Sequence, residues 1–217
     1  MSIVDEKETL RRSMVQAIAA MTDEEKNRQG TMLCRRLETL LPRAPIAIGA
    51  FAPLPDEPDI RPLLRTCLDE KHLLYLPRYD GGGITFHAVE NLDELQAGAF
   101  GIPEPSASAP SPDPSTLSLV LVPGRAFDGN GNRLGRGKGG YDRWIARQRT
   151  ANPRTSFWGI IFSCQIRDSV PAETHDQKMD AVITPEKHCL PEWHPNECRA
   201  SVPDPPPLHT QHMGEYS

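Results

Sequence analysis

Long apolar segments are missing from this 217-residue sequence, in which no run approaches the roughly 18 residues that a membrane-spanning helix requires. The first residues, MSIVDEKETLRRS, include acids and lack the apolar core of a signal peptide. The five cysteines are odd in number and none of them forms a CxxC pair, which argues against a disulfide framework. We therefore expect reduced thiols, a cytoplasmic location and no membrane partner.

A strong positive charge is also missing, because the formal net charge is −5. This charge argues against binding of nucleic acid or of an anionic membrane by overall attraction. The balance is reversed over residues 125–149, where six arginines and one lysine stand against two aspartates. This contrast favours a small anionic ligand, and we expect no nucleic-acid partner.

Helical and strand-like patterns alternate along the chain. Thr22 and Glu25 occupy capping-box positions before the second helix, Asp59 stands where it can cap the third, and Pro77 follows a strand. We expect two helices within 5–41, further helices at 59–70 and 141–149, and strands at 46–51, 72–76, 84–89, 117–122, 158–162 and 181–184. The alternation predicts an α/β fold, a single domain with a mostly parallel sheet flanked by helices.

Two proline-rich segments stand apart from this pattern. Five prolines fall between Pro103 and Pro114, which predicts an extended, mobile loop at 103–116. From Pro185 to the last residue there are seven prolines and little periodicity. We therefore expect a folded domain at 1–186 and a disordered tail at 187–217.

Glycines and cations are concentrated in residues 122–143, VPGRAFDGNGNRLGRGKGGYDR. Seven of the sixteen glycines fall between Gly124 and Gly140. Glycine allows the backbone to approach a ligand closely, and the interleaved arginines and lysine supply positive charge. Cations such as Arg136 and Lys138 at the start of a helix are unfavourable unless an anion binds there. The segment predicts a phosphate-binding loop that leads into a helix.

Two common nucleotide motifs do not account for this loop. Gly135, Gly137 and Gly140 fit GxGxxG literally, but twelve residues separate Val122 from Gly135 and the next predicted strand carries no suitable acid. A Walker A loop fails because Lys138 is not followed by serine or threonine. A flexible, glycine-rich surface loop remains an alternative, although such loops do not usually lead directly into an apolar-faced helix.

Two acids near this loop are candidate metal ligands. Taken alone, each has a simpler interpretation, Asp142 as a first-turn partner of the helix dipole and Asp180 as an ordinary loop acid before the last strand. If the two acids lie side by side, they can hold Mg²⁺ together with oxygens of ATP. No Ser-His-Asp or Cys-His nucleophile is apparent in the sequence.

Taken together, several separated motifs resemble the 5-formyltetrahydrofolate cyclo-ligase family, also called methenyltetrahydrofolate synthetase. The resemblance extends from about Lys7 to Thr184. The motifs are Lys7-x-x-Leu10-Arg11, FAPLPDEPD (51–59), LPR (76–78), GIPEP (101–105), the glycine-rich segment and PAETHDQKMDAVIT (171–184). The resemblance implies a fold shared with ribose-5-phosphate isomerase and CoA transferases. It also implies ATP- and Mg²⁺-dependent conversion of 5-formyltetrahydrofolate, a reduced folate, to 5,10-methenyltetrahydrofolate, with release of ADP and phosphate.

The resemblance also implies roles for individual residues. The implied ATP site consists of Lys7, Arg11, Arg133, Leu134, Gly135, Arg136, Gly137, Lys138, Gly139, Gly140 and Tyr141. The implied folate contacts are Leu54, Asp59 or its neighbour Glu57, and the backbone of Arg136, Gly137, Lys138, Gly139 and Gly140. Asp142 and Asp180 match the magnesium positions.

The implied reaction explains why positive charges are needed in the glycine-rich segment. Phosphorylation of the formyl oxygen gives an imidoyl phosphate, which the second folate nitrogen attacks to close the ring. Arg136 and Lys138 are the expected catalytic residues, because they can stabilise the charge on the moving phosphoryl group. The chain departs from the family at Gly140, where a tyrosine is usual. A weakly active, regulatory paralogue and an enzyme for another small molecule therefore stay open, and we expect a monomer or weak homodimer.

Overall fold

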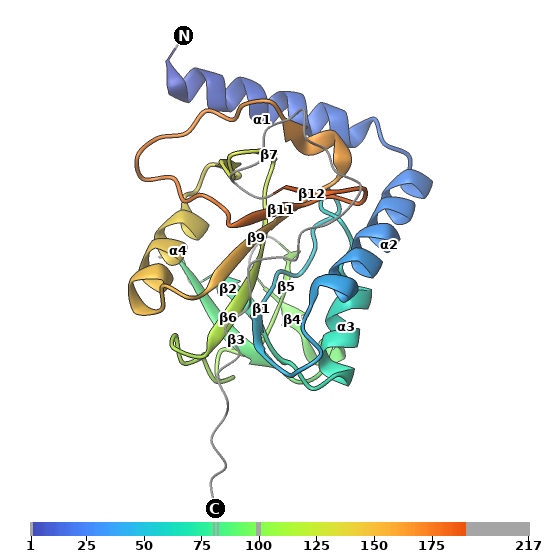
Figure 1. The fold of residues 1–217 in the computed structure, drawn as a ribbon, viewed down its shortest axis with the longest axis vertical. Coiled ribbons are helices and arrows are strands. Elements are labelled where there is room, and N and C mark those ends of the chain that lie inside the picture. The colour runs from blue at the N-terminus through green and yellow to red at the C-terminus, as the bar shows by residue number, and fades with distance from the viewer. Residues whose placement is uncertain (1, 80, 82, 99–100, 190–217) are drawn as a thin grey trace, which may run out of the picture.

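A seven-stranded sheet forms the centre of the computed structural model, which describes residues 2–79, 81, 83–98 and 101–189 (Figure 1). The strand order is β12-β11-β9-β6-β1-β2-β3. The five strands from β11 to β2 are parallel, and the edge strands β3 and β12 pair antiparallel. The bounds are β1 Ala47–Gly49, β2 Leu73–Tyr79, β3 Ile84–Val89, β6 Leu117–Pro123, β9 Ser156–Ile160, β11 Ala181–Ile183 and β12 His188–Cys189. The predicted α/β fold with a mostly parallel sheet is confirmed.

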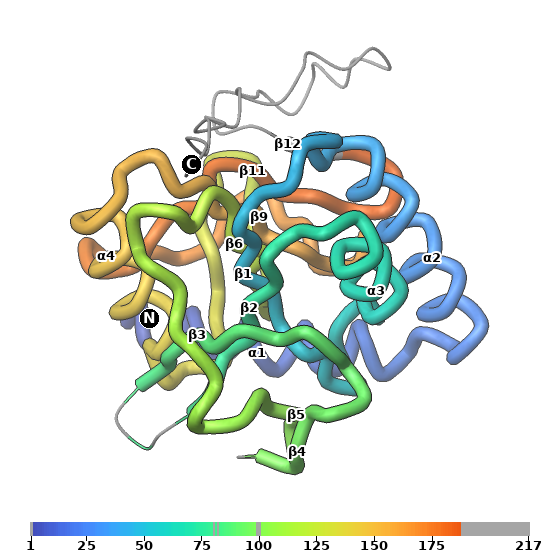
Figure 2. Tube along the Cα trace, turned by 90° about the horizontal axis from the view of Figure 1, so that it is seen from below, coloured from blue at the N-terminus to red at the C-terminus, as the bar shows by residue number. Residues whose placement is uncertain are grey.

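Helices cover both faces of this sheet. They are α1 (Ile3–Ala19), α2 (Asp23–Leu40), α3 (Arg61–Asp69) and α4 (Gly140–Ala151). Figure 2 shows α2 and α3 on one face and α4 on the other, while α1 crosses the end of the sheet in Figure 1. Two apolar clusters fill the layers, one that includes residues of α2 and α3 and one that includes Tyr141 and Ile145 of α4. Burial on both faces explains why the strands are apolar runs.

Short strands and 3₁₀ turns lie outside the central sheet. Part of the glycine-rich segment is itself β structure, because β7 and β8 pair antiparallel and β10 joins β7. The bounds are β4 Gln96–Ala97, β5 Pro103–Glu104, β7 Ala126–Asp128, β8 Arg133–Leu134, β10 Ile166–Arg167 and the 3₁₀ turns η1 Leu92–Glu94 and η3 Ser163–Gln165. The segment predicted as one loop is therefore a hairpin followed by a shorter loop at 135–139.

The helix starts confirm one of the two predicted caps. The Thr22 hydroxyl accepts a hydrogen bond from the Glu25 N–H at 3.1 Å, but the Glu25 carboxylate pairs with Arg28, so the reciprocal half of a capping box does not form. The prediction that Asp59 caps α3 is wrong. The cap residue is Ile60, and Asp59 instead accepts from the N–H and guanidinium of Arg61.

The strand predicted to end before Pro77 continues to Tyr79. Residues two apart in a strand direct their backbone N–H and C=O groups toward the same neighbouring strand. Tyr75 faces the β1 side, because its carbonyl accepts from the Ala50 N–H, and Pro77 therefore faces that side too. Strand β1 ends at Gly49, opposite Tyr75, so the missing N–H of Pro77 interrupts no pairing with β1. The extension matters because Tyr79 reaches the cavity described below.

The loop at 103–116 is held by hydrogen bonds at several points, and its expected mobility stays a prediction. The Ala88 N–H donates to the Pro110 carbonyl at 2.7 Å, and Gln148 of α4 donates to the Pro114 carbonyl at 2.8 Å. Prolines lack an N–H but keep a carbonyl acceptor, which explains how such a segment docks. The predicted disordered tail at 187–217 begins too early, because His188–Cys189 form the edge strand β12, and residues 190–217 lie outside the described residues. Within the described part of the chain, no helix is long and apolar enough to span a membrane.

Candidate functional site

A cavity of about 790 Å³ opens at the carboxyl ends of the parallel strands. Its walls come from α1, the segment after β1, the β2–β3 hairpin, the loop at 135–139 with the start of α4, and residues 173–176. Crevices at the carboxyl ends of strands are the usual ligand sites of open α/β sheets. The topology alone therefore makes this cavity the candidate site.

Most of the predicted site residues line this cavity. The residues that do so are Lys7, Arg11, Leu54, Glu57, Arg133, Leu134, Gly135, Arg136, Gly137, Lys138, Gly139, Gly140, Tyr141 and Asp142. The two predicted residues that are not among the lining residues are Asp59 and Asp180. Of the two folate alternatives, Glu57 therefore faces the cavity, while Asp59 pairs locally with Arg61 at 2.7 Å.

The backbone of the loop at 135–139 requires glycine. Gly137 and Gly139 have φ angles of 98° and 62°, which lie in the left-handed region that other residues rarely adopt. Gly139 is the N-cap of α4 and has no side chain to satisfy the first N–H groups of that helix. The loop is fixed from α1, because the Arg11 Nε donates to the Gly135 carbonyl at 3.0 Å. The cavity therefore contains an uncapped helix N-terminus beside cations, which is an anion-binding arrangement.

A network of ion pairs joins this loop to the segment after β1. The Asp56 carboxylate accepts from both Arg125, at 2.5 Å, and Arg136. Arg136 also donates to Glu57 at 2.7 Å, while the second oxygen of Glu57 accepts from the Leu54 N–H. Burial by itself raises the pKa of Asp56, but the hydrogen bonds from the two arginines outweigh it and the pKa is lowered. Asp56 was not predicted as a site residue.

A second network fixes α1 at the opposite wall. Lys7 is only 7% exposed, and its ammonium pairs with Glu173 at 2.8 Å and with Asp176 at 2.5 Å. Burial by itself lowers the pKa of Lys7, but the hydrogen bonds to these carboxylates outweigh it and the pKa is raised. Lys7 therefore lies at the cavity as a charged residue that holds residues 173–176. Its predicted contact with ATP stays a prediction.

Arg133 connects several segments of the cavity wall. Its Nη2 donates to Asp142 at 2.8 Å and its Nη1 to the Pro123 carbonyl, and its guanidinium lies 5.5 Å from the centre of the Tyr141 ring. The second oxygen of Asp142 accepts from the Gln177 N–H at 3.2 Å. These bonds tie β8, α4 and the segment before β11 together.

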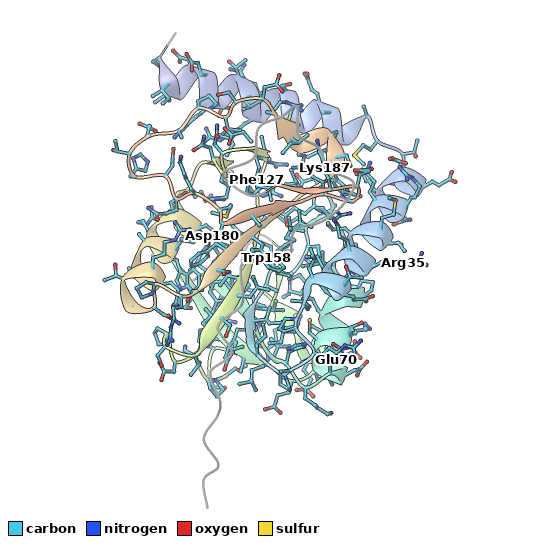
Figure 3. All side chains as sticks on the ribbon, in the orientation of Figure 1. Arg35, Glu70, Phe127, Trp158, Asp180 and Lys187 are labelled. Atoms are coloured by element: carbon cyan, nitrogen blue, oxygen red, sulfur yellow. The ribbon has the colours of Figure 1, made fainter. Side chains whose placement is uncertain are left out.

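The two predicted magnesium ligands have different positions. Asp142 lines the cavity, whereas Asp180 lies beside α4 (Figure 3), where it accepts from Arg149 at 3.2 Å and from the Phe157 N–H at 2.7 Å. Among the described residues, no three His, Cys, Asp or Glu side chains gather as a metal site. Mg²⁺ is often held by one or two carboxylates together with phosphate oxygens and water. Both acids have both oxygens engaged, Asp142 with Arg133 and the Gln177 N–H and Asp180 with Arg149 and the Phe157 N–H. They differ in that only Asp142 is among the lining residues, where it can meet an ion that arrives with phosphates.

Part of the cavity wall is apolar and aromatic. It is formed by Phe51 and Leu54 after β1, by Tyr79 and Ile84 of the hairpin, and by Tyr141. Burial raises the pKa of Tyr79 to about 12, so this phenol stays neutral. A Cβ atom placed on Gly140 would lie 3.1 Å from the Cδ1 of Ile84, so the side chain of Ile84 lies directly beside the position where the family tyrosine is absent.

Among the lining residues that sequence reasoning missed are two groups from distant segments. One is Tyr79 with Ile84, and the other is Glu173, His175 and Asp176. The motifs LPR and PAETHDQKMDAVIT lie next to these groups or contain them, and they were the signal that could have located them. Only the hairpin register and the packing of α1 bring these segments to the cavity.

Comparison with known proteins gives consistent matches. A family model described as the 5-formyltetrahydrofolate cyclo-ligase family matches residues 3–185. The 5-formyltetrahydrofolate cyclo-ligase of Mus musculus is 26% identical, with 82% of this chain and 92% of the mouse protein covered. That of Escherichia coli is 30% identical, with 77% of this chain and 94% of the bacterial protein covered. The solved 5,10-methenyltetrahydrofolate synthetase of Aquifex aeolicus has a TM-score of 0.73 at 28% identity, covering 89% of this chain and 99% of that one.

Proposed function

This chain belongs to the 5-formyltetrahydrofolate cyclo-ligase family, and from that premise we propose that it converts 5-formyltetrahydrofolate and ATP into 5,10-methenyltetrahydrofolate, ADP and phosphate. The main supporting observation is that one cavity joins a cationic glycine loop to an apolar, aromatic wall. A volume of about 790 Å³ is typical of small-molecule sites. The cavity offers charge for phosphates and flat surfaces for a heterocycle in one place.

The cations at the loop account for the first chemical step. The formyl oxygen attacks the γ-phosphorus of ATP, a P–O bond forms to that oxygen, and the bond to the ADP oxygen breaks. Charge on the phosphoryl oxygens is stabilised by Arg136 and Lys138 and by the uncapped N–H groups of α4. Arg136 is held by Asp56 and Glu57 before the reaction, so its guanidinium is already oriented in the cavity.

The apolar wall accounts for the second step. The second folate nitrogen attacks the carbon of the imidoyl phosphate, the C–O bond breaks and phosphate leaves with the former formyl oxygen, while the nitrogen loses its proton. Ring closure depends on holding the two nitrogens in one geometry, which the aromatic and aliphatic side chains at Tyr79, Ile84 and Leu54 can provide. Glu57 lies at the same wall and can accept from an N–H of the heterocycle. No covalent enzyme intermediate is needed.

Magnesium dependence is part of the proposal. Asp142 is the cavity carboxylate that would hold the ion, with phosphate oxygens completing its shell, and the ion would supply charge neutralisation. Both oxygens of Asp142 accept hydrogen bonds in this structure, from Arg133 and from the Gln177 N–H, so the ion would share these oxygens with those donors. A second contribution from Asp180 requires that its bond to Arg149 breaks.

Growth of the methenyltetrahydrofolate absorbance band tests this function. Purified protein is mixed with 5-formyltetrahydrofolate, ATP and Mg²⁺, and the controls omit ATP or Mg²⁺. The proposal predicts a band that grows only in the complete mixture. Absence of the band with folded protein contradicts it.

Ligand-dependent thermal stability separates the alternatives if turnover is absent. A ligand at about 100 times its dissociation constant adds ~2.7 kcal/mol to the free energy of unfolding. Stabilisation by ATP and by 5-formyltetrahydrofolate without turnover would indicate a weakly active, regulatory paralogue, which the departure at Gly140 favours. Stabilisation by ATP alone would indicate a different small-molecule substrate.

A further inference from the structure

Glu104 is a buried acid that the proposed reaction does not use. It is 1% exposed and is not among the residues that line the cavity. It belongs to the motif GIPEP (101–105), which, like LPR (76–78), has no part in the reaction steps above. Burial of a carboxylate costs free energy unless charged or polar partners compensate for it. The partners of Glu104 therefore indicate what this acid is for.

These partners come from the end of β2. The Oε1 of Glu104 accepts from the Tyr79 N–H at 3.3 Å, and its Oε2 lies 3.5 Å from the Nη1 of Arg78. The same Nη1 donates to the Pro105 carbonyl. Arg78 is the arginine of LPR, so the two motifs meet in one network that joins β2 to β5.

The hairpin of β4 and β5 leaves room for the Glu104 side chain at Gly98. A Cβ atom placed on Gly98 would overlap the carboxyl group of Glu104. The Gly98 N–H donates to the Ile102 carbonyl at 2.8 Å, so the hairpin backbone is held where it encloses the acid. The packing thus requires glycine at this position for reasons of space.

The network lies next to residues that line the cavity. Pro77 and Tyr79, which flank Arg78 on β2, are lining residues, and so is Ile102, two residues before Glu104. All three side chains belong to the apolar or aromatic part of the lining. Glu104 therefore ties together the two segments that carry them.

The phosphate-binding loop at 135–139 is held by a different set of bonds. Arg11 donates to the Gly135 carbonyl, and Arg136 pairs with Asp56 and Glu57. These bonds come from α1 and from the segment after β1, whereas those of Glu104 come from β2 and β5. Two networks shape two parts of one cavity, so they can be disturbed separately.

We propose that Glu104 is a positioning residue for the heterocycle of the substrate, because it holds β2 and β5 together so that Tyr79 and Ile102 form one apolar surface. The inference rests on the proposed function for the identity of that substrate. It gives LPR and GIPEP a shared role on the folate side of the cavity, separate from the ATP side.

Glu104→Gln tests the proposal, because it keeps the shape of the side chain but leaves one acceptor oxygen in place of two. The amide cannot accept from both Arg78 and the Tyr79 N–H. In steady-state assays of methenyltetrahydrofolate formation, kcat/KM for 5-formyltetrahydrofolate should fall about 10- to 100-fold, as it does when a substrate is slightly misplaced. The KM for ATP should stay within about 2-fold, because the bonds that hold the loop at 135–139 are unchanged.

Gly98→Ala is a second variant, which displaces the Glu104 carboxyl group without changing any charge. It should produce the same selective loss for 5-formyltetrahydrofolate, so the test does not depend on the folding of Glu104→Gln. Thr155→Val is the matched structural control. Thr155 is 3% exposed, donates to the Leu117 carbonyl at 2.8 Å and is not among the lining residues. Its loss should lower the thermal midpoint and leave the KM values for both substrates unchanged.

The outcomes separate this inference from the proposed function. A wild-type protein that turns over 5-formyltetrahydrofolate, with unchanged kcat/KM in both Glu104→Gln and Gly98→Ala, overturns the inference alone. An equal loss for ATP and for 5-formyltetrahydrofolate also overturns it, because it would show a merely structural role. Absence of turnover by the folded wild type contradicts the proposed function, and the inference with it.

Discussion

The ion pairs at the cavity and those on the outer helices differ in what they connect. Arg136 and Asp56 are 80 residues apart and join two loops, and Lys7 and Asp176 are 169 residues apart and join α1 to a third segment. On the helices, Arg28 pairs with Glu25 three residues away, with side chains 53% and 36% exposed. Exposed pairs of that kind contribute about 0–1 kcal/mol. The comparison indicates that charge maintains the shape of the cavity but adds little elsewhere.

The largest difference in kcat between a cavity variant and an outer-helix variant is expected for Lys138 and Lys26. Lys138→Ala should lower kcat by about 100- to 1,000-fold, because one donor to the developing phosphoryl charge is lost. Lys26→Ala, on α2 and outside the cavity, should leave kcat unchanged. Near-normal turnover of Lys138→Ala would remove this residue from the catalytic role.

The next largest difference is expected in the Mg²⁺ requirement of variants at the two predicted magnesium ligands, Asp142 and Asp180. Asp142→Asn should raise the Mg²⁺ concentration needed for half-maximal turnover by about 10- to 100-fold, in the range found when metal-site contacts are lost. Asp180→Asn should change it by less than about 3-fold, because its oxygens bind Arg149 and the Phe157 N–H outside the cavity. Magnesium titrations of turnover measure both values, and an equal shift in the two variants would show that both acids hold the ion.

Asp56 and Asp59 lie three residues apart, but only Asp56 belongs to the ion-pair network at the cavity. Variants of the two residues therefore compare a cavity pair with a local surface pair. Asp56→Asn should lower kcat/KM about 10-fold, because Arg125 and Arg136 lose the carboxylate that holds both. Asp59→Asn removes only a local, exposed pair with Arg61 and should change kcat/KM by less than about 2-fold. Steady-state kinetics decide the matter, and a larger effect at Asp59 would assign the folate contact to that residue.

The smallest effect concerns stability and its dependence on pH. Asp176 has a lowered pKa: burial by itself raises it, but the hydrogen bonds from the Glu173 N–H and Lys7 outweigh burial. Its contribution is therefore present above its unfolded value, about 3.9, and is lost as pH falls through the folded one. Lys7 has a raised pKa, so its contribution is present below about 10.4 and is lost as pH rises further.

Lys7→Met should therefore destabilise the protein by about 1–3 kcal/mol between these limits, and the difference from wild type should shrink outside them. Urea unfolding at several pH values gives the free energies. Arg28→Ala is the surface control and should cost less than about 0.5 kcal/mol. A pH-independent cost at Lys7 would show that packing, not the ion pairs, explains the loss.

The elements that were predictable from sequence are those whose signal is local. Apolar runs located β3 and β6, and Thr22 located the start of α2, because periodicity and caps depend on neighbouring residues. The predictions for the cap of α3 and for the end of β2 were wrong. Asp59 accepts a hydrogen bond from Arg61 instead of capping the helix, and β1 ends before it would pair with the N–H position of Pro77.

The candidate site divides in the same way. The glycine loop was visible in the sequence, because its residue types are unusual in any context. The partners of the site's cations were not, because Asp56 meets Arg136 of the loop, and Glu173 and Asp176 meet Lys7 of α1, only after the sheet has formed. The buried pairing of Glu104 with Arg78 is likewise a property of packing, since a glutamate in a sequence does not reveal which donors surround it.

Transfer of the formyl oxygen is the most direct test of the account, which holds that this cavity activates that oxygen by phosphorylation. 5-Formyltetrahydrofolate labelled with ¹⁸O in its formyl group is converted in the presence of ATP and Mg²⁺, and the released phosphate is analysed by mass spectrometry. The account predicts one ¹⁸O atom in each phosphate formed with 5,10-methenyltetrahydrofolate. Unlabelled phosphate, with the label found in water, would contradict it.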